Sequence, residues 1–398
     1  MPALQAGHHL RLLVGGAEFF PALLAAIDGA QQEVHLETYI LHQDLVGASV
    51  VDALVRAATR GVQVFLVVDG IGTPSVPMDW QQRLQHSGAQ WQQFSPLGRL
   101  GLLIPGRWRR LHRKLCVVDR SLAFCGGINL LDDHFELHHG WQSSPRFDFA
   151  VQVQGPLVAQ VHGTMRQFWY RLQATRQFEQ GRFQAARQAL GWWGGRPAAA
   201  AAPREAGGVR AALVLRDNLR YRAAIERAYR QAIAHARDEV LIANAYFMPG
   251  AKLRRALVHA VQRGVRVQLL LQGRYEFFMQ YHAARAFYSD LLQAGVEIHE
   301  YQAGYLHAKV AVIDGHWATV GSSNLDPLSL LLAREANVVV DDVAFAQSLL
   351  RPLRQAMATH SQALHAGQFA QRPWWQRGKD TLALVLMRVT LFLSGNDY

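Results

Sequence analysis

The chain has 398 residues, of which 50% are hydrophobic and 18% are charged, and its 41 Lys and Arg against 30 Asp and Glu give a formal net charge of +11. These values exclude a disordered tail, a collagen and a small disulfide scaffold, and the length allows two or three hydrophobic cores or one fold built twice. The basic balance predicts an acidic partner, which is nucleic acid, anionic lipid or another phosphate ester.

The chain carries no signal for export or for a membrane-spanning helix. Residues 1–13 have no long apolar run and no small-residue cleavage site, so we expect a cytosolic start rather than a signal peptide. No window reaches the ~18 uninterrupted apolar residues that a spanning helix requires. The two cysteines, Cys116 and Cys125, are too few for a disulfide framework and lack a zinc-ligand spacing, so we expect both to be buried in strands.

Two segments of the first half of the chain recur in the second half. Residues 33–40 (EVHLETYI) resemble residues 239–247 (EVLIANAYF), and residues 57–64 (AATRGVQV) resemble residues 260–267 (AVQRGVRV). In each half, an apolar strand, a stretch of helical periodicity and a second apolar strand follow one another. This order predicts right-handed crossovers and a parallel or mixed sheet covered by helices, an α/β fold.

The repeat and the composition between its copies predict the domain organisation. Residues 191–208 (GWWGGRPAAAAAPREAGG) are rich in Gly, Pro and Ala and indicate a linker. We therefore expect a first half over residues 1–190, a second half over residues 209–360 and a C-terminal tail over residues 361–398. At the end of the first half, residues 161–189 have the spacing of a packed amphipathic helix.

Each half contains the motif H-x-K-x4-D, followed by a turn of small residues that ends in asparagine. The two copies are His112, Lys114 and Asp119 with Asn129, and His307, Lys309 and Asp314 with Asn324. The interval from histidine to asparagine is 17 residues in both copies, and the chain has only four lysines. Two of four lysines at the same place in a repeated motif indicate a shared chemical role.

The residue types of the motif suit a phosphodiester. Histidine and lysine two residues apart on a strand share one face, and the following turn brings the asparagine back beside that face. Doubling this unit about a pseudo-twofold axis places two of each residue around one centre. The lysines and asparagine amides would stabilise charge on the phosphate oxygens, while one imidazole attacks phosphorus and the other protonates the leaving alkoxide. A phosphohistidine is the expected intermediate.

Four acidic residues near the motifs divide into two groups. Asp119 and Asp314 lie an odd number of residues from their histidines, so we expect them to face away from the site, to cap a strand end and to be structural. Asp148 and Glu335 each lie in an otherwise apolar strand, where a carboxylate needs a partner, and we expect them to orient the imidazoles. A surface salt bridge is the alternative. We find no cluster of carboxylates, Cys and His in the sequence that indicates a required metal. The two lysines can supply the positive charge that a metal would otherwise provide.

With two H-x-K-x4-D motifs, each with its trailing small-residue turn and asparagine, the sequence resembles the phospholipase D superfamily over about residues 15–355. Within that superfamily, GGINLLDDH after the first motif, and GSSNLDPLSL and REANVVV after the second, resemble the bacterial cardiolipin synthases. The length is most similar to the cardiolipin synthase B group.

The resemblance implies two tandem phospholipase D-like α-β-α halves related by a pseudo-twofold axis, with the active site at their interface. It also implies transphosphatidylation, in which one phosphatidylglycerol yields a phosphatidyl-enzyme and glycerol, and a second phosphatidylglycerol attacks to give cardiolipin. No metal or other cofactor is implied. The active-site set carried over is His112, Lys114, Asn129, His307, Lys309 and Asn324. The family usually assigns the nucleophile to the first motif, which favours His112.

Only the second motif offers a hydroxyl beside its asparagine. The first copy reads GGIN and the second reads GSSN. Any serine contact to the phosphate is therefore available only at Ser322 or Ser323.

Two segments outside the motifs suit a lipid surface. Residues 97–111 (LGRLGLLIPGRWRRL) mix apolar side chains with four arginines, and we expect Arg107, Trp108, Arg109 and Arg110 to contact headgroups. The tail carries Trp374 and Trp375 with two basic residues ahead of a short apolar segment, which resembles an interfacial anchor. The alternatives are an ordinary basic loop and a C-terminal helix docked on the core. We expect the protein to lie on the cytoplasmic side of a bacterial inner membrane, bound peripherally through phosphatidylglycerol and cardiolipin.

Two other functional classes remain open. A nuclease or another phospholipase D-type phosphodiesterase could use the same site, and the charge would suit a polyanion. The apolar character of the basic loop and the Trp-rich tail count against a nucleic-acid substrate. A membrane-binding protein without turnover would leave the doubled catalytic set unexplained. The sequence does not specify an oligomeric state.

Overall fold

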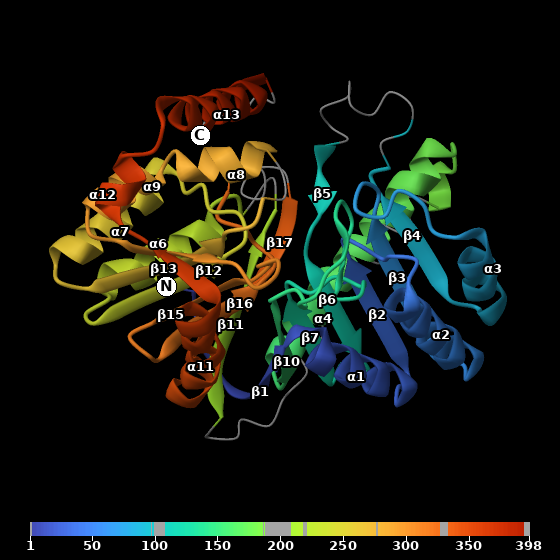
Figure 1. Cartoon of the computed structure of the whole chain (residues 1–398). Coiled ribbons are helices and arrows are strands. Elements are labelled where there is room, and N and C mark those ends of the chain that lie inside the picture. The colour runs from blue at the N-terminus through green and yellow to red at the C-terminus, as the bar shows by residue number, and fades with distance from the viewer. Residues whose placement is uncertain are drawn as a thin grey trace.

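The structure is a computed structural model that describes residues 2–96, 98, 108–185, 187, 208–217, 221–275, 278–326 and 333–393. These residues form a mixed sheet of 16 strands with helices packed on its faces, together with a two-stranded hairpin. Figure 1 shows the two halves side by side, the blue-to-green N-terminal half on the right and the yellow-to-red half on the left. The predicted linker lies outside the described residues except for Gly208.

The first half contains most of the strands and helices that the repeat predicts. Its elements are β1 (Gln5–Val14), α1 (Gly15–Asp28), β2 (Glu33–Thr38), α2 (Leu45–Thr59), β3 (Gln63–Asp69), α3 (Met78–Ser87), β4 (Gln90–Phe94), β5 (Arg110–Leu111), β6 (Lys114–Val118), β7 (Leu122–Gly126), β8 (Phe135–Glu136), β9 (Gly140–Trp141), β10 (Phe149–Gln154) and α4 (Leu157–Glu179). The helix predicted over 161–189 corresponds to α4, which begins earlier and ends earlier.

The second half repeats this series and continues to the C-terminus. Its elements are β11 (Val209–Arg216), α6 (Ala224–His235), β12 (Glu239–Asn244), α7 (Ala251–Gln262), β13 (Arg266–Gln272), α8 (Phe278–Arg285), α9 (Tyr288–Gln293), β14 (Glu297–Tyr301), β15 (Lys309–Ile313), β16 (Trp317–Gly321), β17 (Ala333–Asp341), α11 (Val343–His360), β18 (Ser361–Leu364), α12 (Ala366–Ala370) and α13 (Trp374–Leu393).

The two halves have the same strand order. From the centre outward, the first half runs β1-β10-β7-β6-β2-β3-β4, and the second runs β11-β17-β16-β15-β12-β13-β14 with β18 added at the edge. In both halves the crossover strands pair in parallel, β2 with β3 and β12 with β13. The central strands β1 and β11 pair in the antiparallel direction, with His8 opposite Val209. This arrangement confirms the mixed sheet and the two similar α/β halves that the sequence predicts.

Glycine explains why the same helix-to-strand junction recurs. Gly61 follows α2 with a φ of 93°, and Gly264 follows α7 with a φ of 88°. Other residues rarely adopt this left-handed conformation, so each glycine ends its helix and turns the chain into the next strand. At its other end, α2 begins at the cap residue Asp44, whose carboxylate accepts a hydrogen bond of 2.8 Å from the backbone N–H of Gly47.

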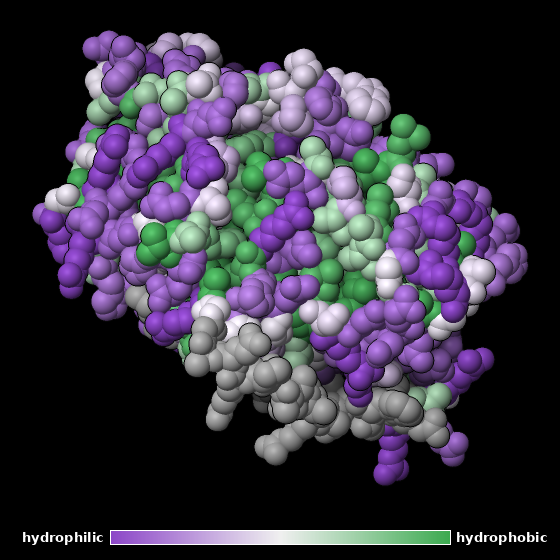
Figure 2. Space-filling model, turned by 90° about the horizontal axis from the view of Figure 1, so that it is seen from below, coloured by the Kyte–Doolittle hydropathy of each residue, from purple (hydrophilic) through white to green (hydrophobic). Residues whose placement is uncertain are grey.

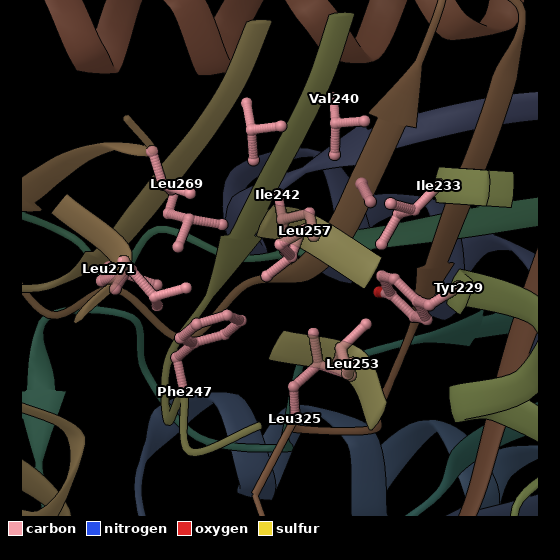
Figure 3. Close-up of a cluster of buried hydrophobic side chains, with 14 of the residues drawn as sticks. Tyr229, Ile233, Val240, Ile242, Phe247, Leu253, Leu257, Leu269, Leu271 and Leu325 are labelled. Carbon is pink, nitrogen blue, oxygen red and sulfur yellow. The ribbon is translucent and has the colours of Figure 1, made fainter. Parts of the chain in front are cut away.

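The core of the second half forms between helices and one face of the sheet. In Figure 3, Ile233 of α6 and Leu253 and Leu257 of α7 lie toward Ile242 and Leu269 on the strands. All five side chains are almost completely buried. Each contributes on the order of 1.5–3 kcal/mol through burial, which fixes the strands that carry the functional residues. Cys116 and Cys125 are likewise buried and free, as predicted.

The C-terminal residues differ from a separate tail. Residues 361–364 form the edge strand β18, which pairs with β14 and so extends the second half. The helix α13 packs on α8 through its buried Ala383 and Met387. The sequence misses β18 because a short edge strand has no alternating pattern and is defined only by its partner.

No helix among the described residues is long and apolar enough to cross a bilayer. Viewed from below, apolar side chains gather in the middle of the surface, between polar side chains at both margins (Figure 2).

Candidate active site

Each motif histidine lies two residues before a strand, and the opposite half holds its backbone. The N–H of His112 donates to the carbonyl oxygen of Arg334 at 3.0 Å, and the N–H of His307 donates to the carbonyl oxygen of Phe147 at 2.9 Å. The prediction that histidine and lysine share a strand is therefore only partly right. Lys114 and Lys309 begin β6 and β15, whereas the histidines precede them, because their backbone groups pair across the interface.

The two predicted orienting acids each meet the histidine of the other half. Glu335 Oε1 lies 2.8 Å from Nδ1 of His112, and Asp148 Oδ2 lies 2.6 Å from Nδ1 of His307. Both carboxylates are almost fully buried. A surface salt bridge, the alternative reading, does not describe these pairs. Neither half therefore contains a complete set of its own, and the site exists only where the halves meet.

The lysines bring positive charge to the same centre. Nζ of Lys114 donates to the carbonyl oxygen of His112 at 2.6 Å, and Nζ of Lys309 bonds the carbonyl oxygen of His307 in the same way. Burial, together with a smaller effect of the nearby Lys309, lowers the pKa of Lys114 to about 7 against the opposing effect of Glu335. An anion bound between the two lysines would offset their repulsion and favour the charged form of Lys114.

The two histidine–carboxylate pairs differ in their electrostatics. Burial lowers the pKa of both imidazoles, which are neutral in this form of the site. Burial raises the pKa of Asp148 to about 7. Burial also opposes ionisation of Glu335, but His112, Lys114 and Ser322 outweigh it and hold the pKa of Glu335 below its ordinary range. Glu335 is therefore ionised more readily than Asp148.

A serine explains part of this difference, and its position corrects the sequence prediction. The Ser322 hydroxyl accepts from the N–H of Ala336 at 3.1 Å and donates to Glu335 Oε2 at 2.5 Å. The Ser323 hydroxyl donates to the carbonyl oxygen of Asn324 at 3.3 Å. Both serines are completely buried, so this geometry does not support the predicted serine contact to phosphate. Their hydroxyls are used within the protein.

The first half cannot make the equivalent bond. Gly127 stands where the second motif has Ser322, and a Cβ atom on it would lie 2.3 Å from Asp148 Oδ1. The loop therefore passes too close to Asp148 for any side chain. The carboxylate accepts instead from the N–H of Phe149 at 2.8 Å.

The motif asparagines are buried close to the strand ends. Oδ1 of Asn129 accepts from the N–H of Ile40 at 3.3 Å. Oδ1 of Asn324 has no hydrogen-bond partner among the described residues. Their contact to the phosphate stays a prediction.

The motif aspartates bind backbone far from the imidazoles. Asp119 accepts from the N–H groups of residues 31–33 at 2.7–3.0 Å, and Asp314 accepts from those of residues 237–239 at 2.9–3.0 Å. Each aspartate has a positive φ, 49° for Asp119 and 50° for Asp314. They fasten the start of β2 and β12 to the turn after the motif strand, which is the structural role that the sequence predicts.

Sequence reasoning missed two residues around the first motif. The Tyr39 ring packs on that of His112 at 4.9 Å, and Nζ of Lys114 lies 5.3 Å from the Tyr39 ring centre. Burial raises the pKa of the Tyr39 hydroxyl to about 12. Asp69 Oδ2 accepts from the N–H of Leu111 at 2.7 Å, immediately before His112. The sequence feature that could have identified Asp69 is its position at the end of the second strand of the repeated unit.

The second half uses a neutral group for the same backbone contact. Gln272 Oε1 accepts from the N–H of Leu306 at 3.1 Å, immediately before His307. Gln272 ends β13 as Asp69 ends β3. The two half-sites are thus similar in backbone and different in charge.

The expected membrane residues are spread over different environments. Arg107 lies outside the described residues. Arg109 is exposed, but Arg110 and Trp108 are half-buried, and burial lowers the pKa of Arg110 near Asp69. The side chain of Arg110 is therefore less accessible to lipid headgroups than the sequence predicts.

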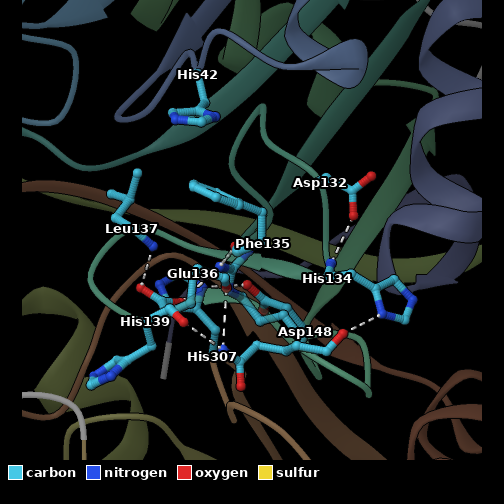
Figure 4. Close-up of polar contacts among 12 residues, drawn as sticks. His42, Asp132, His134, Phe135, Glu136, Leu137, His139, Asp148 and His307 are labelled. Carbon is cyan, nitrogen blue, oxygen red and sulfur yellow. Dashed lines mark hydrogen bonds and ion pairs between the residues drawn. The ribbon is translucent and has the colours of Figure 1, made fainter.

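Among the described residues, exposed tryptophan side chains lie on the helix α13 and on the β8–β9 hairpin. Trp374 on α13 is 83% exposed, and Trp375 next to it is also exposed. The β8–β9 hairpin, which lies beside His307 and Asp148 (Figure 4), exposes Leu137 and 68% of Trp141. The sequence did not single out this hairpin.

Within the described residues, Glu33, His35 and His162 are the one group of His, Cys, Asp and Glu side chains close enough to share a metal ion. This group is not part of the paired histidine site. The sequence gives no sign of it, because His162 is far from His35 along the chain.

The chain is similar to known proteins over most of its length. The family model described as cardiolipin synthase, PLD-like domain, matches residues 23–143 and 229–357. The chain is 38% identical to cardiolipin synthase B of Salmonella typhimurium and 37% identical to that of Escherichia coli K12, over 96% of this chain and 88% of each relative. Its fold is similar to that of a phosphatidylserine synthase from Haemophilus influenzae, with a TM-score of 0.69, 14% identity and coverage of 97% of this chain and 95% of that one.

Proposed function

The chain belongs to the cardiolipin synthase family with PLD-like domains, and we propose that it is a phosphatidyltransferase that makes cardiolipin from phosphatidylglycerol. In the overall reaction, two phosphatidylglycerol molecules give one cardiolipin and one glycerol. The observation that carries this proposal is the pair of histidines, each held by a buried carboxylate of the opposite half. Two such imidazoles can attack phosphorus and exchange a proton with the alcohol at the same centre.

The lysines give the site its preference for a phosphodiester anion. Two buried ammonium groups, with no carboxylate salt bridge to Lys114 among the described contacts, can stabilise charge on the non-bridging oxygens as it develops. A metal ion is not needed for this stabilisation.

The different carboxylates favour His112 as the nucleophile. With Glu335 ionised, His112 donates Nδ1–H to it, which leaves the lone pair of Nε2 available to attack phosphorus. The Asp148–His307 pair retains a proton more readily, because burial raises the pKa of Asp148 to about 7. His307 is then the group that holds an N–H at Nε2 for the leaving oxygen.

The two steps follow from these protonation states. In the first step, Nε2 of His112 forms a bond to phosphorus, the bond to the glycerol oxygen breaks, and His307 gives its Nε2 proton to that oxygen while its Nδ1 takes the proton held by Asp148. In the second step, a hydroxyl of another phosphatidylglycerol attacks phosphorus, Nε2 of His307 removes the hydroxyl proton while Nδ1 returns its proton to Asp148, and the bond to His112 breaks. The proton passed to His307 in the second step restores the starting state.

Activity on defined vesicles tests this function. The purified full chain, incubated with phosphatidylglycerol vesicles and EDTA, should form cardiolipin and free glycerol, which lipid mass spectrometry and a glycerol assay measure. Activity that is lost in EDTA without loss of the fold, and restored only by a divalent ion, would contradict the metal-free mechanism. Cleavage of DNA without any lipid product would favour the nuclease alternative.

We propose that the protein attaches peripherally to an anionic membrane on its cytoplasmic side, and the exposed aromatic residues support the attachment itself. On α13, the exposed Leu382, Val385 and Val389 lie on one face, opposite the face that packs on α8. Lys379 lies 5.1 Å from the Trp375 ring, so apolar and basic side chains are adjacent. The tail is therefore both docked on the core and able to present an apolar face to lipid.

Vesicle sedimentation separates attachment from chemistry. Trp374→Ser should reduce binding to phosphatidylglycerol vesicles several-fold, and high salt should reduce binding of the parent. Phe178→Ser, which removes an exposed aromatic residue on α4, serves as the matched control. Equal binding of both variants and the parent at all salt concentrations would contradict a membrane role for α13.

A further inference from the structure

A buried polar group lies between β2 and α4, apart from the paired histidine site. Glu33 and His35 are two residues apart on β2 and so share one face of the strand. His162 on α4 packs against that face. More than nine-tenths of each side chain is buried, since the exposed fractions are 7%, 5% and 9%. Buried polar groups of this kind require partners.

The spacing of the atoms is unlike that of a fully hydrogen-bonded network. Nε2 of His162 lies 2.9 Å from Glu33 Oε1 but makes no aligned hydrogen bond among the described residues. Nε2 of His35 lies 3.4 Å from Glu33 Oε2. The three side chains offer ligand atoms that all lie within 4.8 Å of one another.

These separations suit ligands that converge on a metal ion. Zinc binds imidazole nitrogen and carboxylate oxygen at about 2.0–2.2 Å in tetrahedral geometry, which places neighbouring ligand atoms about 3.3 Å apart. Two imidazoles with one carboxylate are a ligand set that zinc accepts, with water as a fourth ligand. The ring of His35 also stacks on Phe65 at 4.5 Å, which fixes its orientation.

Arg120 is the cation that now balances Glu33. Its Nε donates to Glu33 Oε1 at 2.5 Å, but 60% of its side chain is exposed to solvent. The guanidinium can turn outward into solvent, which would leave Glu33 Oε1 available to an ion.

We propose that Glu33, His35 and His162 bind a divalent transition-metal ion such as Zn²⁺, which displaces Arg120 and ties α4 to β2. The ion is structural, because the paired histidines and lysines that carry the chemistry are a separate group. This inference does not rest on the proposed function, and its tests measure binding and stability rather than turnover.

Titration of the metal-free full chain tests the proposal. Calorimetry with Zn²⁺ should give one ion per chain, and Co²⁺ should give the intense visible absorption of a tetrahedral site. Zn²⁺ should raise the Tm of the parent. His162→Gln should weaken binding by about tenfold or more and abolish the Tm shift. His86→Gln, at an exposed position on α3, is the matched control and should bind as the parent does.

A surface substitution keeps the test decisive if His162→Gln does not fold. Arg120→Gln removes the competing cation and leaves the three ligands in place, so it should tighten Zn²⁺ binding several-fold. Absence of stoichiometric binding to the parent, or equal binding by His162→Gln and the parent, would overturn the proposal. Unchanged affinity in Arg120→Gln would overturn the displacement of Arg120.

Discussion

Ser322→Ala removes a single buried hydroxyl and tests whether that hydroxyl keeps Glu335 ionised. The hydroxyl donates to Glu335 Oε2 at 2.5 Å, and both groups are fully buried. A hydrogen bond to a charged group contributes about 1.5–3 kcal/mol, and about 1.4 kcal/mol corresponds to a tenfold change in an equilibrium. Loss of this bond favours the protonated carboxyl, so the pKa of Glu335 should rise.

The pH dependence of kcat/KM measures this effect. The active form requires ionised Glu335, so activity falls at low pH as the carboxylate is protonated. In Ser322→Ala this acidic limb should move upward by about one to two pH units, while activity well above the limb changes little. Lipid product formed from phosphatidylglycerol vesicles is measured across the pH range, with urea unfolding as a check on stability.

Ser323→Ala is the matched control. Its hydroxyl is equally buried but donates at 3.3 Å to a backbone carbonyl oxygen and not to the carboxylate. Its acidic limb should coincide with that of the parent. If Ser322→Ala and Ser323→Ala gave the same pH profile, the hydroxyl would not tune Glu335, and the reasoning that favours His112 as nucleophile would lose its structural support.

Three further outcomes test the proposed roles. With a phosphatidyl p-nitrophenyl ester, His112→Ala should form no adduct, whereas His307→Ala should release one equivalent of p-nitrophenol and keep an acid-labile label on His112. If peptide mass spectrometry finds the parent's label on His307, the two histidines have the opposite roles. Activity should also fall as the pH rises through about 7, because burial raises the pKa of Asp148 to about 7 and the acid form is lost above it. Asp148→Asn should lower kcat by ~10²–10⁴. A parent profile that stays flat to high pH would contradict this role of Asp148. Asp119→Ala leaves three backbone N–H groups without their acceptor and should lower the free energy of unfolding by about 1–3 kcal/mol in urea titrations, whereas an unchanged midpoint would argue against its structural role.

The fold could be predicted where local patterns repeat. The apolar strand at residues 33–40 and its counterpart at 239–247 form β2 and β12, because apolar runs bounded by turns identify strands without knowledge of their partners. The short edge strand β18 could not be found in this way, since it is stabilised by pairing with β14 rather than by its own sequence.

The candidate site was only partly visible for a similar reason. The motif residues His112 and His307 are identified by a repeated spacing, which is a local property. Tyr39 and Asp69 carry no motif, and they become part of the site only because β2 and β3 end close to His112 and to β5, the strand that precedes it. The sequence predicts that Ser322 or Ser323 contacts the phosphate, whereas in the structure the Ser322 hydroxyl donates to Glu335.

The sequence by itself determined that this protein doubles one α/β unit and that each copy carries a histidine, a lysine and an asparagine at the same intervals. Spacing along the chain decides these features, because side-chain periodicity and motif chemistry are local. Only the tertiary structure decided which carboxylate serves which histidine. The partners His112 and Glu335 are 223 residues apart, and His307 and Asp148 are 159 apart. They meet because the two halves join at the centre of one sheet, so the carboxylate of each half lies beside the histidine of the other. A contact between segments this far apart has no fixed spacing along the chain, so local sequence patterns do not predict it.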